Sequence, residues 1–468
     1  MSLATSILIL LSACATKLDQ NNKLESKPTQ GISGELIVKA SELVVPQQWS
    51  NLLKQLDASD NWLQNFNDPL LINTVKQALN HNFELKQQAL SVDIKKRQLL
   101  NAGSQFWPDL SASLSTGRRK SEQVSNSASL SLKSSVEFDL WGKLSANEQK
   151  ANAEWLAQQA NFEQAQQQLV VNTVNAWYNA VAAEKQLQLN QQRSKNTRQN
   201  LAIIESGYKQ GINSSLDVYL TRNELNSALA RVAQLKQNLL LAKRQLESLL
   251  GKYPDASIIL SAKLVDISAE ISLETPSKII QQKPNLRASW YQLLASDAQL
   301  AFTHKQRFPS FTLSASLSDS QQNLTDLLSG SSLAWSLLGN ISAPLFQAGR
   351  LKNNEDIARL TLRQQEQNYL AVVYQAFSEV ENAITAEISL QQQAILQERA
   401  GKNAQAAYKL SFEQYQQGLI DYSTVLDAQN RWFDAQSSVI DIKNKLITNR
   451  VNLNLALGGR FSNSLSQS

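Results

Sequence analysis

The strongest constraint on this sequence is a helix break that occurs twice. Gly211 and Gly418 lie 207 positions apart, and each interrupts a long polar helical pattern. In both copies a Tyr stands three positions before the Gly and a Val stands seven positions after it. The same spacing relates the Leu-Gly pairs at 250–251 and 457–458, where the helical patterns end. A helical hairpin made twice predicts a duplicated chain.

Each half of the chain also contains one very long helical pattern. The pattern from 143 to 210 predicts a helix of about 68 residues, or roughly 100 Å at 1.5 Å per residue. A second long helix restarts near 350, and apolar residues spaced seven apart favour coiled-coil packing in both. These residues are Trp155, Phe162, Leu169 and Ala176, matched by Leu362, Tyr369, Ala376 and Ala383. Shorter helical patterns at 70–106, 216–250 and 285–306 predict that two short helices stack end to end beside each long one.

Four segments alternate apolar and serine-rich positions, at 109–115, 127–140, 311–318 and 332–342. This period of two predicts strands with one apolar and one polar face. Each is about long enough to cross a membrane when tilted, and a serine-rich face suits a wet lumen. A half-buried hairpin of a soluble sandwich is the alternative. No later stretch reaches the roughly 18 apolar residues of a membrane helix, so any part of the chain that spans a membrane would have to consist of strands. Four strands leave two exposed edges, which other copies of the chain would have to cover.

The N-terminal segment ends at the only cysteine of the chain, Cys14. Residues 1–13 are apolar and end in Leu-Ser-Ala before Cys14, which is similar to a lipobox. We therefore expect a lipoprotein signal peptide and a Cys14 that carries diacylglycerol and an acyl chain; an ordinary signal peptide with an incidental Cys is the alternative. Ala15 follows in place of Asp, which favours the outer membrane. The segment lacks Lys and Arg, which favours a start upstream of Met1.

The composition argues against several function classes. The formal net charge is +5, but Lys and Arg are scattered among Asp and Glu, so we expect no nucleic-acid partner. His81 and His304 are the only histidines, and neither has an acidic or Cys residue at metal-ligand spacing. We expect both at the surface. Without a phosphate loop or a nucleophile motif, we predict no enzyme, no metal and no cofactor beyond the lipid on Cys14.

Several stretches together resemble the TolC-like outer-membrane efflux proteins, and within them the lipoproteins related to OprM and NodT. They are 62–69, the helix-Pro-strand junctions at 107–108 and 308–309, 138–143, 343–350, and 422–429 with 457–458. The resemblance covers nearly the whole mature chain. It implies an α+β membrane protein in which a long coiled-coil helical barrel forms a periplasmic tunnel. This tunnel joins a transmembrane β-barrel that is completed by homotrimerisation, with four strands per chain.

The resemblance and the repeat together predict the domain organisation. The expected units are a signal peptide (1–13), an N-terminal tether and equatorial segment (14–67), a first repeat (68–250), an equatorial connector (251–283), a second repeat (284–458) and a tail (459–468).

The resemblance further implies an outer-membrane exit duct of a tripartite efflux pump in a Gram-negative cell. The duct would passively conduct small molecules or ions through the periplasm to the exterior. The implied partners are a periplasmic adaptor protein, an inner-membrane pump of the resistance-nodulation-division type, and outer-membrane lipid. A duct for protein secretion and a non-conducting structural lipoprotein are the alternatives, and the strands count against the second because a spacer needs none.

Asp427 is the candidate gate residue. It follows the second helix break, where a carboxylate near a helix start is also mildly stabilising on its own. The resemblance places the matching Asp at the periplasmic constriction, where three carboxylates in a trimer would attract cations and repel anions. Ser423 is a candidate second ring, although relatives of OprM tend to carry a bulky apolar residue there. Thr424 matches a position that is acidic in TolC, so we expect a single acidic ring.

The resemblance also implies that the two helix breaks dock the adaptor protein. Glycine permits positive φ at each break, and small residues let another helix approach closely. The expected docking residues are Gly211, Ile212, Ser214, Ser215, Gly418, Leu419 and Tyr422. Leu220 stands at the position that Asp427 holds in the second copy. We therefore expect the second hairpin to line the constriction and the first to pack outside it.

Overall fold

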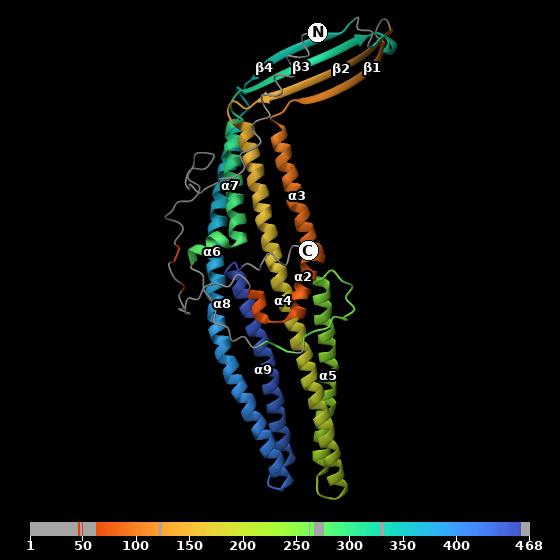
Figure 1. Ribbon diagram of the computed structural model, residues 1–468, viewed down its shortest axis with the longest axis vertical. Helices are drawn as coiled ribbons and strands as arrows, with labels where there is room; N and C mark the ends of the chain where they lie inside the picture. Colours follow the sequence, from red (N-terminus) through yellow and green to blue (C-terminus); the bar gives the residue numbers. More distant parts are fainter. Residues whose placement is uncertain are drawn as a thin grey trace.

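The computed structural model describes residues 45–46, 49, 62–120, 124–261, 263–265, 276–327 and 332–459. The expected signal peptide, Cys14, most of the tether and the tail from 460 onwards lie outside these residues. The described chain is an elongated rod of helices with a sheet at one end (Figure 1).

The sheet contains four antiparallel strands in the order β1-β2-β3-β4, so β1 and β4 lie at its two edges. The strands are β1 (Asp109–Lys120), β2 (Val124–Phe138), β3 (Ser310–Gln321) and β4 (Ala334–Ser342). All four alternating segments of the sequence are therefore confirmed as strands. Serine hydroxyls pair across neighbouring strands, with Oγ–Oγ distances of 2.8 Å for Ser113–Ser131 and for Ser316–Ser336. The polar face is thus continuous from β1 to β4.

Two helices of 67 residues run from the sheet to the far end of the rod (Figure 1). They are α4 (Lys143–Lys209) and α8 (Arg350–Gln416), and they return as α5 (Ser215–Leu249) and α9 (Tyr422–Ala456). The predicted pair of long helical hairpins is confirmed. Within the described ranges, no helix is long and apolar enough to cross a membrane.

Shorter helices complete the half of the rod nearer the sheet. They are η2 (Trp62–Phe66), α2 (Pro69–His81), α3 (Phe83–Ser104), α6 (Pro276–Gln282) and α7 (Pro284–Lys305), while the short η3 (Leu324–Asp326) lies between β3 and β4. Asp68 caps α2 as the sequence suggests, because its Oδ1 accepts the Leu70 and Leu71 amides at 3.1 and 3.2 Å. The end of the expected connector is helical, as α6.

The prediction of one continuous helix over 70–106 was wrong, because the chain breaks at Asn82 between α2 and α3. Asn82 has ψ of 127°, outside the helical region. Its Oδ1 accepts the Leu85 amide at 2.8 Å and so caps α3, while its Nδ2 donates to the Leu249 carbonyl at 3.0 Å. Asparagine competes well with helical backbone hydrogen bonds in this way. The break ties the upper helices to the end of α5.

The two repeats superpose along the sequence with two constant offsets. Helices α3 and α7 have 22 residues each and start 201 positions apart. Helices α4 and α8 start 207 positions apart, as do α5 and α9. The strand registers agree with the same two offsets, 201 for β1 to β3 and 207 for β2 to β4. Asp109 faces Ser135 in the first repeat, and their counterparts Ser310 and Ser342 face each other in the second. The extra residues of the second repeat therefore lie between β3 and β4.

Glu355, near the start of α8, holds a cluster of basic side chains below the sheet. Its carboxylate lies 2.7 Å from Arg307 Nη1, 3.0 Å from Arg359 Nη2 and 3.3 Å from His304 Nδ1. Burial alone would raise the pKa of Glu355, but hydrogen bonds from these partners outweigh it and lower the pKa to about 2. His304 is half-exposed, so its expected surface position is confirmed, but it does have an acidic partner, 51 positions later.

This shift predicts an acid-sensitive contact. A carboxyl with a lowered pKa in the folded state stabilises the fold above its ordinary pKa, and this stabilisation is lost as the pH falls from 4.5 towards 2. We expect Glu355→Gln to remove about 2–3 kcal/mol at neutral pH and to have little effect near pH 2. Unfolding followed by circular dichroism from pH 7 to pH 2 would measure the difference. An equal effect of the substitution at both ends of this range would contradict the assignment.

Candidate functional site: the hairpin tips and a polar groove

The two turns at the far end of the rod are built around glycines. Gly211 and Gly418 have φ of 75° and 72°, values that residues with a Cβ rarely adopt. A Cβ at either position would meet no atom within 4 Å, so the backbone conformation alone requires glycine. Ser214 then starts α5 with a capping box, in which the Asp217 amide donates to Ser214 Oγ at 3.1 Å. The role of both glycines as turn residues is confirmed.

The expected docking residues are divided between the surface and the interior. Ile212 and Leu419 are large apolar side chains at the tips of the two turns, and they are 74% and 67% exposed. Ser214 and Ser215 are also accessible. Tyr422 is different, because only 2% of it is exposed. Its side chain lies inside the tip and does not project from it.

Tyr422 belongs to an apolar cluster that joins the two hairpins. It packs with Ile204 of α4, Val218 of α5 and Val425 of α9, all buried. Burial raises the pKa of Tyr422 to about 12, so it is neutral at physiological pH. Nearby, the Tyr415 hydroxyl donates to Asn213 Oδ1 at 2.9 Å. The two hairpins therefore contact each other at their ends within one protomer.

Arg193 makes a second, charged link between the hairpins. Its Nη2 donates to Glu224 Oε1 of α5 at 2.8 Å and to Asn430 Oδ1 of α9 at 2.6 Å. Nη1 lies 3.5 Å from Asp434 Oδ1, and the guanidinium lies over the Phe433 ring at 5.7 Å. The planar guanidinium can serve several acceptors at once in a way that Lys cannot. No local sequence pattern marks this residue, because its α9 partners are more than 200 positions away.

Asp427 lies on an exposed face of α9, just past the tip. Ser423 and Thr424 are exposed on the preceding turn. Asp427 Oδ2 accepts from Arg431 Nε at 2.8 Å, and both side chains are largely exposed. The sequence analysis did not consider Arg431, although its i, i+4 spacing from Asp427 is a known signal for helix ion pairs. The candidate gate is therefore an Asp–Arg pair on each chain.

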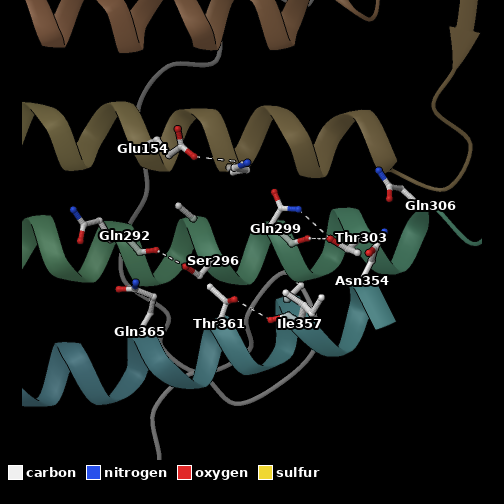
Figure 2. Close-up of a pocket in the computed structure, with 13 residues that line it drawn as sticks. Glu154, Gln292, Ser296, Gln299, Thr303, Gln306, Asn354, Ile357, Thr361 and Gln365 are labelled. Atoms are coloured by element: carbon white, nitrogen blue, oxygen red, sulfur yellow. Dashed lines mark hydrogen bonds and ion pairs between the residues drawn. The ribbon is translucent and has the colours of Figure 1, made fainter. Parts of the chain in front are cut away.

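The upper part of the rod presents a polar groove of about 500 Å³ between α4, α7 and α8 (Figure 2). Its labelled residues include Gln292, Ser296, Gln299 and Thr303 of α7 and Thr361 of α8. The hydroxyls of Ser296 and Thr303 donate to backbone carbonyls one turn earlier, at 3.1 and 2.7 Å. The groove is thus lined largely by amides and hydroxyls, and some of these hydroxyls already donate to carbonyls of their own helix.

The described chain thus combines a sheet with a serine-rich face, a groove with polar side chains and a tip with an exposed ion pair. Comparison with known proteins gives the family. The Outer membrane efflux protein family model matches residues 74–252 and 275–459, and the chain belongs to this family. The chain is therefore an outer-membrane channel of efflux pumps, which is a non-enzymatic transport protein with the TolC-like fold.

Proteins of similar sequence align with most of the chain. It is 28% identical to the Probable outer membrane lipoprotein SilC of Salmonella typhimurium over 428 residues, covering 89% of this chain and 92% of SilC. It is also 28% identical to the Cation efflux system protein CusC of Escherichia coli, with 89% and 93% covered. The Toluene efflux pump outer membrane protein TtgF of Pseudomonas putida is 28% identical, with 88% of each covered.

Solved structures show the same architecture. A crystal structure of CusC superposes with a TM-score of 0.81 at 25% identity and covers 90% of this chain and 98% of CusC. The outer-membrane channel OprN superposes with a TM-score of 0.80 at 21% identity, with 94% and 98% covered. The predicted family, fold class, localisation and transport function are confirmed. The alternatives of a soluble sandwich and a structural spacer are not supported.

Proposed function

We propose that three copies of this chain form the duct and that acylated Cys14 anchors each copy in the outer membrane. The four-stranded sheet supports assembly with further copies, because its edge strands β1 and β4 have no neighbour within the described part of the chain, and the number three comes from the likeness to the TolC-like channels. Exposed edges need a partner, and further copies of the same chain are the simplest one. Cys14 lies outside the described residues, and the relative SilC, a probable outer membrane lipoprotein, supports its acylation.

The tips of the hairpins are the proposed docking site of a periplasmic adaptor protein, which links the duct to an inner-membrane pump of the resistance-nodulation-division type. Ile212 and Leu419 support this, because each places a large apolar side chain in solvent at a turn. Small molecules or ions are the proposed cargo. Relatives are named for cation and toluene efflux.

The proposed gate is a ring of Asp427–Arg431 pairs at the periplasmic tip. A fixed charge ring at a narrow point selects ions by sign. Because Arg431 partly compensates Asp427, the two residues act in opposite directions on the potential of the pore. Ser423 and Thr424 lie on the preceding turn and complete the proposed lining.

Two matched substitutions test the gate in planar bilayers. We expect Asp427→Ala to shift the reversal potential in a salt gradient towards anion preference, since the Arg431 charge is then uncompensated. Arg431→Ala should shift it towards cation preference. Asp93→Ala is the control, because its side chain is exposed on α3, in the half of the rod away from the tip.

Low conductance in the wild type with an unchanged reversal potential in both variants would remove these residues from the gate. Such a result would leave the assignment of the chain to the efflux family intact.

A further inference from the structure

The internal repeat specifies how the free edges of the sheet meet. Within one chain, β2 of the first repeat pairs with β3 of the second. By the offsets of 207 and 201, β4 is the counterpart of β2 and β1 is the counterpart of β3. These counterparts are the two edge strands, which lie on opposite sides of the sheet (Figure 1). The contact between repeats inside the chain is thus a template for the contact between chains.

We propose that β4 of one protomer pairs with β1 of its partner in the register of β2 with β3, and that the loop at 343–349 packs against the α3–β1 corner of that partner. This inference rests on the proposed homotrimer and adds the register and the corner contact to it. The occupant of each free edge is therefore a second copy of this chain.

The register that follows from the template is chemically consistent. Ser135 faces Ser314 in the chain, so Ser342 faces Ser113 of the partner subunit. The same shift places Ile341 opposite Leu114 of the partner subunit and Leu345 opposite Leu110 of the partner subunit. Serine therefore meets serine on the polar face, and aliphatic residues meet on the other. A slip of one residue would place the apolar face of β4 on the polar side.

The end of β4 has the appearance of a strand that lacks its neighbour. Strand β2 continues to Phe138, which faces Phe311, but β4 stops at Ser342, three positions before Leu345, the counterpart of Phe138. Leu345 and Phe346 then lie 96% and 88% exposed in the loop. Pairing with residues 110–112 of a partner would extend β4 to Leu345, the counterpart of the last residue of β2, and would provide an apolar neighbour for Leu345.

The corner below the sheet repeats the same relationship. After β2, Trp141 stacks on Phe308 with ring centroids 5.4 Å apart, and its Nε1 donates to the Pro309 carbonyl at 2.8 Å. The counterpart of Phe308-Pro309 is the corner at 107–108, which has the larger Trp107, half-exposed. The counterpart of Trp141 is the small Ala348. The second pair thus keeps a large aromatic residue at the corner but has a small residue in the loop, which leaves room beside Trp107.

Two equivalent hollows lie at these corners. The hollow of about 430 Å³ at the α7–β3 corner has the β2–α4 loop as one wall, including Asp139, Leu140 and Trp141. The hollow of about 530 Å³ at the α3–β1 corner contains Trp107 and Asp109, but the described residues that line it include none of the β4–α8 loop. The loop at 343–349 of a partner would supply the corresponding wall.

The helices below the sheet agree with this arrangement. Ile94 and Leu100 of α3 are more than half exposed, as is Leu360 of α8. Their counterparts in the other repeat are Ala295, Ala301 and Ala153, and all three are buried. Burial of Ile94, Leu100 and Leu360 against a partner subunit would make the two repeats equivalent along the rod.

Disulfide trapping in the full-length chain tests the register. We expect the double variant Ser113→Cys, Ser342→Cys to form covalent dimers and trimers after mild oxidation of outer membranes, because facing residues have Cα atoms roughly 4.5–5.5 Å apart. Pairs shifted by two residues stay on the same face but lie roughly 7–8 Å apart, beyond disulfide reach. The controls Ser342→Cys with Ser111→Cys or with Ser115→Cys should cross-link about tenfold less. Each single variant controls for disulfides through Cys14.

Unheated gels of the wild-type chain report the trimer independently of any cysteine. A wild-type trimer together with preferred cross-linking of a shifted pair, or with no cross-linking of any pair, would overturn the register and leave the homotrimer standing. Absence of any oligomer, both on unheated gels and after oxidation, would instead overturn the proposed homotrimer. Covalent oligomers formed mainly by the 113–342 pair would support the inference.

Discussion

Replacement of Arg193 by Ala should open the periplasmic tip and make the duct leak. Arg193 on α4 is the side chain that contacts α5 and α9 together, through Glu224 and Asn430. Charge-assisted hydrogen bonds of this kind contribute about 1.5–3 kcal/mol each. We take about 2 kcal/mol for the whole link, because the side chain is one-fifth exposed. A loss of this size would raise the population of separated hairpins roughly thirtyfold.

Single-channel conductance and entry of a large antibiotic into cells would measure this opening. Arg198→Ala is the matched control, because Arg198 is an exposed arginine on the same helix. Arg193→Lys should give an intermediate leak, since Lys keeps the charge but loses the planar fork. A closed channel in Arg193→Ala, with wild-type conductance and normal trimer yield, would show that the apolar cluster around Tyr422 holds the tip closed without this link.

The repeat explains why so much of the fold was predictable. Strands and long helices each carry a simple period, and duplication shows each period twice, so a segment such as 311–318 could be checked against 109–115. The helix break at Asn82 was missed because no proline marks it. Its counterpart in the second repeat is Lys283, where the following proline does mark the start of a helix. The break depends on a side-chain hydrogen bond to Leu249, and no local pattern contains that information.

The candidate site was predictable only in part, for a physical reason. The glycine turns stand out along the chain, because backbone conformation depends on local sequence, whereas the gate role predicted for Asp427 came from the resemblance to the TolC-like proteins. Arg193 depends on which helices lie side by side, and its partners come from two other helices. Tyr422 was expected at the surface of the tip, but helical facing alone does not show that a second hairpin covers it.

The largest expected loss of stability comes from a buried ion pair far from the tip. Glu387 of α8 is fully buried, and its Oε1 accepts from Arg450 Nε and Nη2 of α9 at 3.1 and 2.6 Å. Asn449 Nδ2 donates to its other oxygen at 2.8 Å. We expect Glu387→Ala to cost about 3–5 kcal/mol, because it leaves a buried guanidinium without its counter-charge. Chemical denaturation in detergent, followed by circular dichroism, would measure the loss.

A double variant separates charge from packing at this position. Glu387→Met with Arg450→Leu removes both charges and keeps much of the volume, so most of the lost stability should return. A double variant no more stable than Glu387→Ala would show that the hydrogen bonds to Asn449, and not the charge balance, determine the stability of this layer. The pair lies about 30 residues from the turn, or roughly 45 Å along α8. We therefore expect Glu387→Ala to lower stability without changing the reversal potential, in contrast to Asp427→Ala, because this layer joins α8 to α9 within one hairpin, far from the proposed gate.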